Sequence, residues 1–537
     1  MKKIITLLEK RYIKIIFALV SGILTGLTVC FPVIGVLEWI SIIPAALVIF
    51  SLVKSEKHRL RSVYLYGLLF FMAYFVSTWH WFYVMYPMEY TGMTPLAAIT
   101  VILAAILGLP LLQSSAFAFV FMLSVFIMRG KIVQRCKLLI PFVFAALWTA
   151  FEWFQTLFWF GVPWGRLSVG QTEILITAQS ASLFGCYIVT FILVAVNSLI
   201  AYALFSTEAR RLFSLVAASI FCFNIIIGAV IMVSDGAKSS SKIVKVAAIQ
   251  GNISSADKWD DVFWFDNVVK SYGGLTRQAA EEGADIVIWA ETVFPTHIED
   301  FYLGQEFICD LAKECDITLI LGTISYGIDE DGQYNALIAV SPDGEILNDQ
   351  YYKQRLVPFG EYMPWREFLS ALIPALAEVN VLSDDFTSGQ DSNIISTDTA
   401  QIGAIICFDS IYEELTRKSV RNGAEFIAMA TNDSWFFDSA AVSIHLNQAK
   451  LRAIESGRYL VRSANTGISA IITPTGRVLD TEPALRDGYC ISNIELRSNS
   501  TLFSLLGNVF AYISLAFVVF LAVSEPILKL KKGKNNA

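Results

Sequence analysis

Charged side chains are scarce in this chain. Only 16% of its 537 residues are Asp, Glu, Lys or Arg, whereas 55% are hydrophobic, and the mean hydropathy is +0.57. An ordinary soluble domain is roughly a quarter charged, so this shortage excludes a purely soluble protein. The composition predicts a chain that is largely integral to a membrane.

The chain also lacks an excess of positive charge and any metal-binding motif. Lys and Arg number 40 against 47 Asp and Glu, which gives a net charge of −7, so we do not expect nucleic acid as a partner. Neither a CxxC motif nor a His-rich spacing occurs among the eight cysteines and four histidines, so we predict no metal and no cofactor. Cys309 and Cys315 could pair in an oxidising compartment, although nothing in their setting requires a disulfide.

Long apolar runs are what the chain has instead. About 20 apolar residues are needed to cross a bilayer core of roughly 30 Å, and eight such runs are present, near residues 13–34, 38–53, 62–86, 95–128, 139–160, 175–205, 212–233 and 504–527. The 95–128 run is long and contains Pro110, so two shorter crossings are the alternative interpretation of this segment.

The basic residues decide between these two interpretations. If eight spans alternate from a cytoplasmic N-terminus, the Lys and Arg residues within 2–14, 54–61, 129–137, 210–211 and 529–534 all lie inside, while the short outside loops carry Arg166 alone. This is the distribution that the positive-inside rule requires, and two crossings in 95–128 would invert it. We therefore predict eight spans, cytoplasmic termini and residues 235–500 outside. The first span is a retained anchor, since it is too long for a signal peptide.

The outside block has the pattern of a layered α/β domain. After a polar linker at 235–242, short β-branched runs such as 244–249, 286–289, 317–321, 335–340, 403–407, 426–430 and 468–472 alternate with amphipathic stretches. Such alternation predicts a sheet covered by helices. The predicted organisation is therefore a seven-helix bundle at 1–234, a domain at 243–500 and a closing helix at 504–527.

Three polar residues directly follow apolar strands of this domain. Glu291, Cys407 and Asn432 each stand where a predicted strand ends, and functional groups gather at such strand ends. A cysteine there is a nucleophile if its thiolate is stabilised, and an ammonium such as Lys353 would lower the thiol pKa and bind a developing oxyanion. Glu291 would be the base. A Cys-His pair with His297 or His445 is the rival scheme.

Two further groups keep alternative interpretations open. Apolar residues recur at helical spacing after Glu361, from Trp365 to about residue 377, and form either a helix packed on its own domain or an arm lying on the bilayer. The sequence Trp435-Phe436-Phe437 allows the same two interpretations. Glu152 and Arg166 are either functional polar residues near a membrane span or a structural pair.

The short sequence motifs around these residues are similar to those of one family. The order Glu291, Lys353, Cys407 resembles the nitrilase superfamily. Several motifs resemble the apolipoprotein N-acyltransferase family within it: Gln250–Ile253, Lys258-Trp259, Trp289–Thr292, Leu356–Tyr362, Thr431–Asp433, Phe151–Trp153 and Gly161–Gly165. The resemblance extends over nearly the whole chain. It implies an α-β-β-α sandwich between membrane helices.

The resemblance also implies an acyltransferase reaction at a bacterial cytoplasmic membrane. A membrane phospholipid would give an acyl chain to Cys407 as a thioester, and the α-amino group of a lipoprotein's diacylglyceryl-cysteine would accept it in a ping-pong scheme. Lys353 and the Phe408 N–H would stabilise the oxyanion. The domain would face the periplasmic side.

By the same resemblance, Glu361 would orient Lys353 and Cys407, while Trp259, Asn432 and Trp435 would contact substrate. The pair Phe408-Asp409 departs from the Tyr-Glu pair that follows the nucleophile in well-known members of the family, so the contacts of Asp409 do not transfer directly. Two other functions remain open at this point. They are a membrane-tethered amidase or nitrilase-type hydrolase, which would use the same three residues, and a non-enzymatic lipid binder.

Overall fold

The computed structural model describes residues 2–55, 59–88, 94–158, 161–206, 209–236, 242–254, 258, 264–327, 332–372, 385–391 and 394–534. The chain divides into two compact units. The first comprises Met1–Phe82, Val101–Val233 and Leu506–Ala537, and the second comprises Tyr83–Thr100 and Ser234–Leu505. The domain limits predicted from the sequence remain predictions.

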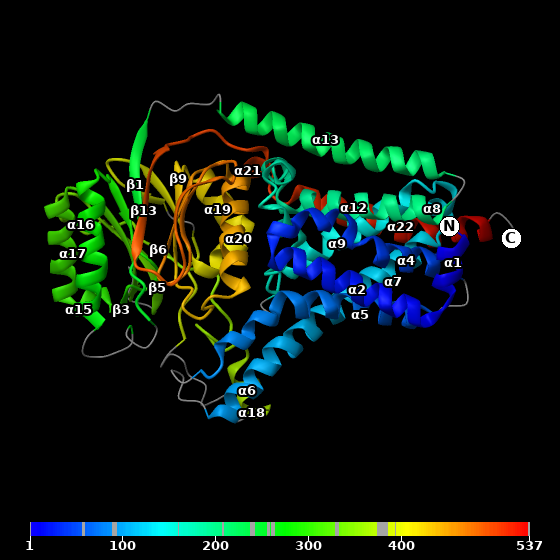
Figure 1. Ribbon diagram of the computed structural model, residues 1–537, viewed down its shortest axis with the longest axis horizontal. Coiled ribbons are helices and arrows are strands. Elements are labelled where there is room, and N and C mark those ends of the chain that lie inside the picture. The colour runs from blue at the N-terminus through cyan, green and yellow to red at the C-terminus, as the bar shows by residue number, and fades with distance from the viewer. Residues whose placement is uncertain are drawn as a thin grey trace. The chain divides into compact units, whose positions relative to one another are not determined.

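The first unit is helical (Figure 1). The helices that belong wholly or partly to it are α1 (Lys2–Glu9), α2 (Arg11–Cys30), η1 (Pro32–Leu37), α3 (Glu38–Ser41), α4 (Ile43–Lys54), α5 (Leu60–Trp79), η2 (His80–Met85), α6 (Pro95–Leu103), η4 (Ala104–Gly108), α7 (Leu109–Met128), α8 (Lys131–Arg135), α9 (Leu139–Gln155), η6 (Leu167–Gln171), α10 (Leu175–Ala178), α11 (Ala181–Phe184), α12 (Cys186–Phe205), α13 (Arg210–Gly236), α21 (Leu502–Leu506) and α22 (Val509–Lys534).

Six helical segments among the described residues are long and apolar enough to cross a membrane. They are Arg11–Cys30, Pro32–Lys54, Leu60–Met85, Pro95–Met128, Cys186–Phe205 and Arg210–Gly236, and the shorter apolar helices include Leu139–Gln155 and Val509–Ser524. The predicted number of eight spans is therefore only approximately supported.

Two predicted span boundaries are wrong, and a glycine explains each. The run 175–205 is not one helix, because Gly185 adopts φ +75° and separates the short α10 and α11 from α12. The C-terminal run is interrupted in the same way by Gly507 at φ +63°, so its long helix begins at Val509. A positive φ cannot continue a right-handed helix.

The segment Pro95–Met128 is one helical segment of 34 residues, so the helix is not divided in two at Pro110. Pro110 lies in the first turn of α7 and has no N–H for a bond to the preceding turn. The backbone just before it takes up a π-helical turn, Ala104–Gly108, which absorbs the missing hydrogen bond without ending the helix.

Two glycines bring α2 and α5 together. Gly22 and Gly26 are four residues apart. A β-carbon on Gly22 would lie 2.2 Å from the Phe70 carbonyl oxygen, and a β-carbon on Gly26 would lie 2.7 Å from the Tyr74 carbonyl oxygen. Small residues at this spacing let two membrane helices approach backbone to backbone.

The second unit contains two sheets. The first has the order β13-β1-β2-β4-β5-β6, with β3 paired to β4; its strands are β1 (Ile243–Gln250), β2 (Ile286–Ile288), β3 (Phe294–His297), β4 (Thr318–Ser325), β5 (Tyr334–Val340), β6 (Tyr351–Tyr352) and β13 (Gly488–Glu495). The second has the order β12-β11-β10-β9-β8-β7; its strands are β7 (Ile394–Ser396), β8 (Gln401–Ile406), β9 (Phe426–Thr431), β10 (Leu460–Ala464), β11 (Ser469–Ile472) and β12 (Val478–Glu482).

Side-chain alternation along the strands sorts the layers of this unit. On β1, Val246 and Ala248 pack between the two sheets with Ile406 of β8, whereas Ala247 and Ile249 face the helices on the outer side of the first sheet. Those helices are α15 (Trp264–Val268), η7 (Val269–Gly273), α16 (Gly274–Glu281) and α17 (Tyr302–Cys315), while α19 (Glu413–Arg421) and α20 (Ala440–Ser456) cover the second sheet (Figure 1). The unit is the α-β-β-α sandwich that the resemblance implies.

Parallel pairing directs the ends of the inner strands toward common edges. In the first sheet β1, β2 and β4 run parallel, and in the second β8, β9 and β10 run parallel. Residues that follow β2, β8 and β9 are therefore gathered at the carboxyl ends of these strands.

The apolar segment that begins at Trp365 forms the short helix α18 (Arg366–Leu372). Trp365 is 62% exposed and Phe368 is 63% exposed, so neither is packed in the core of its own unit. Residues 373–377 of the predicted arm lie outside the described residues. The membrane-surface interpretation of the arm stays a prediction.

Candidate active site

Left-handed backbone conformations cluster around the predicted nucleophile and base. Cys407 has φ +46° at the start of η10 (Cys407–Ile411), Thr292 next to Glu291 has φ +49°, and Phe359 near Glu361 has φ +64°. Each such residue costs roughly 1–3 kcal/mol and persists only when its surroundings enforce it. The fold thus holds three strained turns where the functional side chains emerge.

A single ammonium joins two carboxylates at this site. Lys353, which follows β6, donates from Nζ to Oε1 of Glu291 and to Oε1 of Glu361, both at 2.8 Å. The Lys353 side chain is only 1% exposed. The amide of Asn335 on β5 donates to the same two oxygens at 2.8 and 2.9 Å. A buried ion group of this kind depends on hydrogen bonds to its charged atoms, and the Asn335 amide supplies two of them.

The carboxylates are further fixed by the main chain. Oε2 of Glu291 accepts from the N–H of Asn432 at 2.9 Å, and Oε2 of Glu361 accepts from the N–H of Val357 at 2.8 Å. A β-carbon at Gly322 of β4 would lie 2.8 Å from the Cα of Glu291. The glycine therefore allows the close approach that sets Glu291 beside β4.

The electrostatics of this group favour its ionised form. Burial acts to raise the pKa of Glu291, but Lys353, followed by Lys258 and Asn335, outweighs burial and holds that pKa below its usual range. Burial acts to lower the pKa of Lys353, but Glu291 and Glu361 raise it well above its usual value. Glu291 is therefore a carboxylate at neutral pH and can accept a proton.

The Cys407 thiol is half-buried and interacts electrostatically with both Glu291 and Lys353. Burial raises the pKa of this thiol, Glu291 raises it further, and Lys353 only partly opposes the rise. Lys353 thus lowers the thiol pKa as expected, but burial and Glu291 outweigh it, so the net pKa is raised. The resting side chain is a neutral thiol, and its activation requires a base.

Lys258 is a second buried amine beside this group. Its Nζ donates to the main-chain oxygen of Glu291 at 3.2 Å. Burial, with a smaller contribution from the charge of Lys353, lowers the pKa of Lys258 to about 8, although Glu291 and Cys407 oppose this. Its charge thus changes within the physiological range. Trp259, its predicted substrate-binding neighbour, lies outside the described residues.

Asp409 points into the protein rather than toward a substrate. Its carboxylate accepts from the Tyr351 hydroxyl at 2.8 Å and from the N–H groups of Arg355 and Ile406 at 2.8 and 3.1 Å. The side chain is fully buried. Burial raises the pKa of Asp409 to about 6 against the opposing effect of Lys353. Asp409 therefore braces the strand end that carries Cys407, and Phe408 beside it is half-buried.

The remaining predicted contacts lie on the loop after β9. Asn432 and Trp435 are half-buried, and Oδ1 of Asn432 accepts from the side-chain amide of Asn465 at 3.2 Å. Asn465 also exchanges hydrogen bonds with Ile253, at 2.7 and 3.1 Å. The structure therefore links Asn432 both to Glu291 and to the loop after β1.

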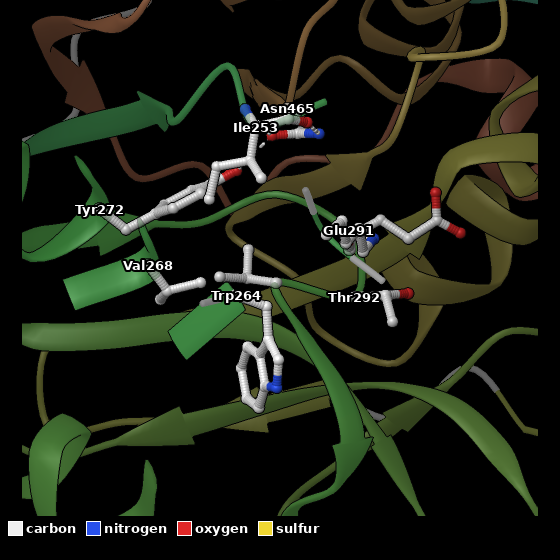
Figure 2. A pocket seen from close by; sticks show the side chains of 9 residues that line it. Ile253, Trp264, Val268, Tyr272, Glu291, Thr292 and Asn465 are labelled. Carbon is white, nitrogen blue, oxygen red and sulfur yellow. Dashed lines mark hydrogen bonds between the residues drawn. The ribbon is translucent and has the colours of Figure 1, made fainter. Parts of the chain in front are cut away.

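A pocket lies behind Glu291 (Figure 2). It is lined by Ile253, Lys258, Trp264, Val268, Tyr272, Glu291, Thr292, Val293 and Asn465. In Figure 2 the Glu291 carboxylate points away from Tyr272 and Val268. The pocket thus adjoins the back of the predicted base and not its reacting oxygens.

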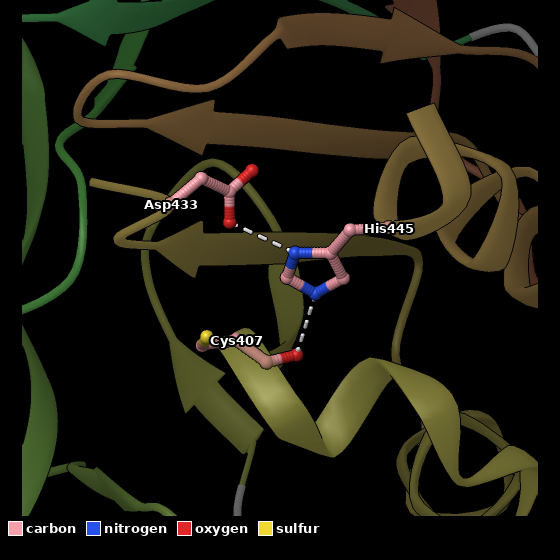
Figure 3. Close-up of side chains that lie close together, drawn as sticks. All are labelled: Cys407, Asp433 and His445. Atoms are coloured by element: carbon pink, nitrogen blue, oxygen red, sulfur yellow. Dashed lines mark hydrogen bonds and ion pairs between the residues drawn. The ribbon is translucent and has the colours of Figure 1, made fainter. Parts of the chain in front are cut away.

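The two histidines of the rival scheme have different surroundings. His297 stacks on Tyr326 with ring centroids 3.7 Å apart. His445 lies beside Cys407, but its Nε2 faces the Cys407 carbonyl oxygen at 3.2 Å, and Figure 3 shows the sulfur on the far side of that residue. Neither arrangement is that of a base hydrogen-bonded to a thiol.

Cys407, Asp433 and His445 offer ligand atoms within 4.8 Å of one another, so they are the residues that come nearest to a metal site among those described. The Asp433 carboxylate is already engaged, because it pairs with both His445 and Arg462. Among the described residues we assign no metal ligand set.

The polar pair of the membrane unit is held by neighbouring helices. Glu152 accepts from Thr190 at 2.7 Å and from the N–H of Leu167 at 3.3 Å, and Arg166 donates to the sulfur of Cys186 at 3.1 Å. These contacts fix the segment after α9. The functional interpretation of the pair stays a prediction.

Comparison with known proteins accounts for both units. Residues 21–199 match the family model of the apolipoprotein N-acyltransferase N-terminal domain, and residues 245–500 match the model of the carbon-nitrogen hydrolase family. An apolipoprotein N-acyltransferase of Allorhizobium ampelinum is 30% identical over 79% of this chain and 78% of its own length. The chain belongs to the apolipoprotein N-acyltransferase family. A second member, from Geobacter metallireducens, is 27% identical over 93% of both chains.

The solved structures similar to this member of the apolipoprotein N-acyltransferase family include a nitrilase-superfamily protein of Saccharomyces cerevisiae. That chain is matched over 96% of its length and covers 51% of this one, with 19% identity and a TM-score of 0.37. An amidase from Nesterenkonia is 18% identical and matched over 93% of its length, with a TM-score of 0.36.

The sequence alone does not single out every polar residue of the site in this apolipoprotein N-acyltransferase family member. Asn335 carries a signal, since it is a polar residue at the start of the apolar run of β5. Lys258 lies in one of the family's sequence motifs, but its position in the sequence does not indicate a chemical role. Asp433 and Arg462 have no local signal, because their pairing joins the loop after β9 to β10.

Proposed function

We propose that this protein is an apolipoprotein N-acyltransferase. It takes an acyl chain from a membrane phospholipid and passes it, through a thioester on Cys407, to the α-amino group of a lipoprotein's N-terminal diacylglyceryl-cysteine. The observation that carries this proposal is the ammonium of Lys353 held between Glu291 and Glu361 beside a cysteine at φ +46°, in a chain with the family's membrane domain.

In the first half-reaction, Glu291 takes the thiol proton and the Cys407 sulfur attacks the ester carbonyl of the phospholipid. Lys353 and the Phe408 N–H stabilise the tetrahedral oxyanion. The C–O bond then breaks, the proton on Glu291 goes to the leaving alkoxide, and a lysophospholipid departs. The ionised state of Glu291 and the protonated state of the thiol support this direction of proton transfer.

In the second half-reaction, the lipoprotein amine attacks the thioester carbonyl. Glu291 accepts the proton that the nitrogen loses, the C–S bond breaks, and the thiolate regains that proton. The new amide leaves with the acyl chain, so one site serves both halves in turn.

The supporting residues take defined parts in this scheme. Glu361 orients Lys353, and Asp409 braces the nucleophile's turn. Asn432, Trp259 and Trp435 contact substrate. The scheme calls for no cofactor and no nucleic acid.

The setting is a bacterial cytoplasmic membrane crossed several times. The basic residues at the span ends support cytoplasmic termini and a catalytic domain on the outer, periplasmic face. This places the site where both the phospholipid donor and the lipoprotein acceptor are available.

The test is intact-mass spectrometry of the full-length protein mixed with phospholipid, with Cys407→Ala as the control. A mass increase of one acyl chain on the parent alone, discharged on addition of a diacylated lipopeptide, is the expected result. An increase that decays equally fast without the peptide would instead identify a hydrolase of the carbon-nitrogen hydrolase type. No increase at all would leave a lipid binder.

A further inference from the structure

A second buried ion cluster lies beside Cys407. His445 of α20 donates from Nδ1 to Oδ1 of Asp433 at 2.8 Å, and Arg462 of β10 donates to Oδ2 of Asp433 at 2.5 Å. All three side chains are at most 1% exposed. Burial acts to raise the pKa of Asp433, but Arg462 and His445 lower it to about 2, so it is a carboxylate that only accepts.

The second nitrogen of the imidazole reaches the nucleophile's main chain. Nε2 lies 3.2 Å from the Cys407 carbonyl oxygen and 3.0 Å from the Ser410 hydroxyl. Figure 3 shows the ring between Asp433 and this carbonyl. A proton on Nε2 donates to the carbonyl, while Nδ1 faces the Asp433 carboxylate on the other side of the ring.

The carbonyl that His445 contacts belongs to the same peptide as the Phe408 N–H. A trans peptide is planar, and its C=O and N–H point in opposite directions. Holding the Cys407 oxygen toward His445 therefore turns the Phe408 N–H toward the side on which the sulfur lies in Figure 3. A hydrogen bond to the carbonyl also polarises the peptide and makes its N–H a better donor.

Cys407 needs such an external hold. Its φ of +46° is unfavourable for a residue with a side chain, and strained positions persist only when their surroundings determine them. His445 is rigid in turn, because its other nitrogen is tied to Asp433, and Asp433 is tied to Arg462.

We propose that His445, anchored by Asp433 and Arg462, is a positioning residue that holds the Cys407–Phe408 peptide and aims the Phe408 N–H at the oxyanion. It touches neither substrate nor sulfur in this role and is not the base of a Cys-His pair. The inference rests on the proposed function only in its thioester-forming step, which an acyltransferase and a hydrolase share.

The test compares two rates in the full-length protein in detergent. The first is acylation of Cys407 by p-nitrophenyl butyrate, which requires oxyanion stabilisation. The second is alkylation of Cys407 by iodoacetamide, which forms no oxyanion. Both are followed by intact mass in His445→Asn and His445→Gln. The Gln amide reaches the position of Nε2, whereas the Asn amide reaches only that of Nδ1.

We expect His445→Asn to acylate about 10²-fold more slowly, the usual cost of losing one oxyanion donor, through kcat rather than KM and with alkylation unchanged. His445→Gln should recover most of that loss, and Asp433→Asn should reduce acylation selectively as well. Unchanged acylation in His445→Asn overturns the inference, as does an equal loss in Asn and Gln. A parallel fall of acylation and alkylation also overturns it, since that outcome means a purely structural role.

His297→Asn is the matched control, because this histidine stacks on Tyr326 in the same unit, and both of its rates should equal those of the parent. The probe ester acylates Cys407 whether or not a lipoprotein amine accepts the chain. Failure of the phospholipid and lipopeptide experiment would therefore refute the proposed function without deciding the role of His445.

Discussion

Two buried ion clusters lie near Cys407, and their charges are arranged in opposite ways. In the first, the carboxylates of Glu291 and Glu361 share the ammonium of Lys353. In the second, the carboxylate of Asp433 is shared by Arg462 and His445. A cluster in which carboxylates share a cation keeps an oxygen that can take a proton, whereas both oxygens of Asp433 are paired and its pKa is lowered to about 2, so it is a poor proton acceptor. The first cluster is therefore suited to chemistry and the second to holding the backbone.

The largest effect is expected when Lys353 is removed from the first cluster. In Lys353→Met, two buried carboxylates lose their shared cation, so acylation of Cys407 should fall by about 10³-fold. Stability should also fall by about 3–5 kcal/mol, the usual cost of breaking a buried ion pair. The measurements are the acylation rate and the free energy of unfolding in detergent.

The control for that variant is Arg277→Met, which removes an ion pair with Glu314 of similar length, 2.7 Å. Both of its side chains are about half exposed, so its loss should cost less than about 1 kcal/mol. If Lys353→Met acylated within tenfold of the parent, the assignment of the first cluster to catalysis would fail.

Asp409, which belongs to neither cluster, should have a smaller effect on the acylation rate. Its pKa of about 6 predicts an acid limb in the acylation rate: below this pH the carboxyl is protonated and loses an acceptor beside Ile406, so the rate should drop about tenfold between pH 7 and pH 5. Glu291 does not give this limb, because its pKa lies below the usual range. In Asp409→Asn, acylation should be slow at every pH and the acid limb should disappear. If the acid limb persisted in this variant, it would have to be assigned to another group.

Protonation of Asp409 should have the opposite effect on stability, because it should slow acylation but stabilise the fold. Its folded pKa of about 6 exceeds the value of about 4 expected in the unfolded chain, so the folded state binds the proton more tightly. The contribution of Asp409 to stability is therefore present below about pH 4 and lost as the pH rises through about 6. A comparison of thermal midpoints in parent and Asp409→Asn over this range checks the sign.

The smallest expected effect belongs to Lys258. Below its pKa of about 8 the amine is charged and supports the ionised Glu291, so Lys258→Met should acylate about three- to tenfold more slowly at pH 7, which corresponds to at most about one pKa unit. Above pH 8 the parent lysine is itself neutral, so the two rates should converge. A ratio that stays constant from pH 6 to pH 9.5 would show that Lys258 acts by packing and not by charge.

Much of the fold could be predicted because it depends on local patterns. Apolar runs with basic ends predict the membrane helices, and alternating apolar residues predict strands such as β1 and β9. The breaks at Gly185 and Gly507 could not be predicted, since an isolated glycine inside an apolar run is compatible with an unbroken helix.

The site divides in the same way. Glu291, Cys407 and Asn432 are predictable because each follows an apolar strand. Lys353 is predictable because it lies in a sequence motif of the family. The net rise in the thiol pKa is not predictable from the sequence, because it depends on burial, which only the packed fold determines. The inward turn of Asp409 and the link from Asp433 to Arg462 likewise depend on contacts between segments far apart in the chain.

The raised pKa of Cys407 has a consequence for the lifetime of the enzyme. Peroxide and other oxidants attack thiolates much faster than thiols, so a nucleophile that stays protonated until an acyl donor arrives resists oxidation while it waits. We expect peroxide to oxidise the exposed Cys136 before Cys407 when both are followed by mass spectrometry. The environment that makes the sulfur dependent on Glu291 for every turnover thus also preserves it between turnovers.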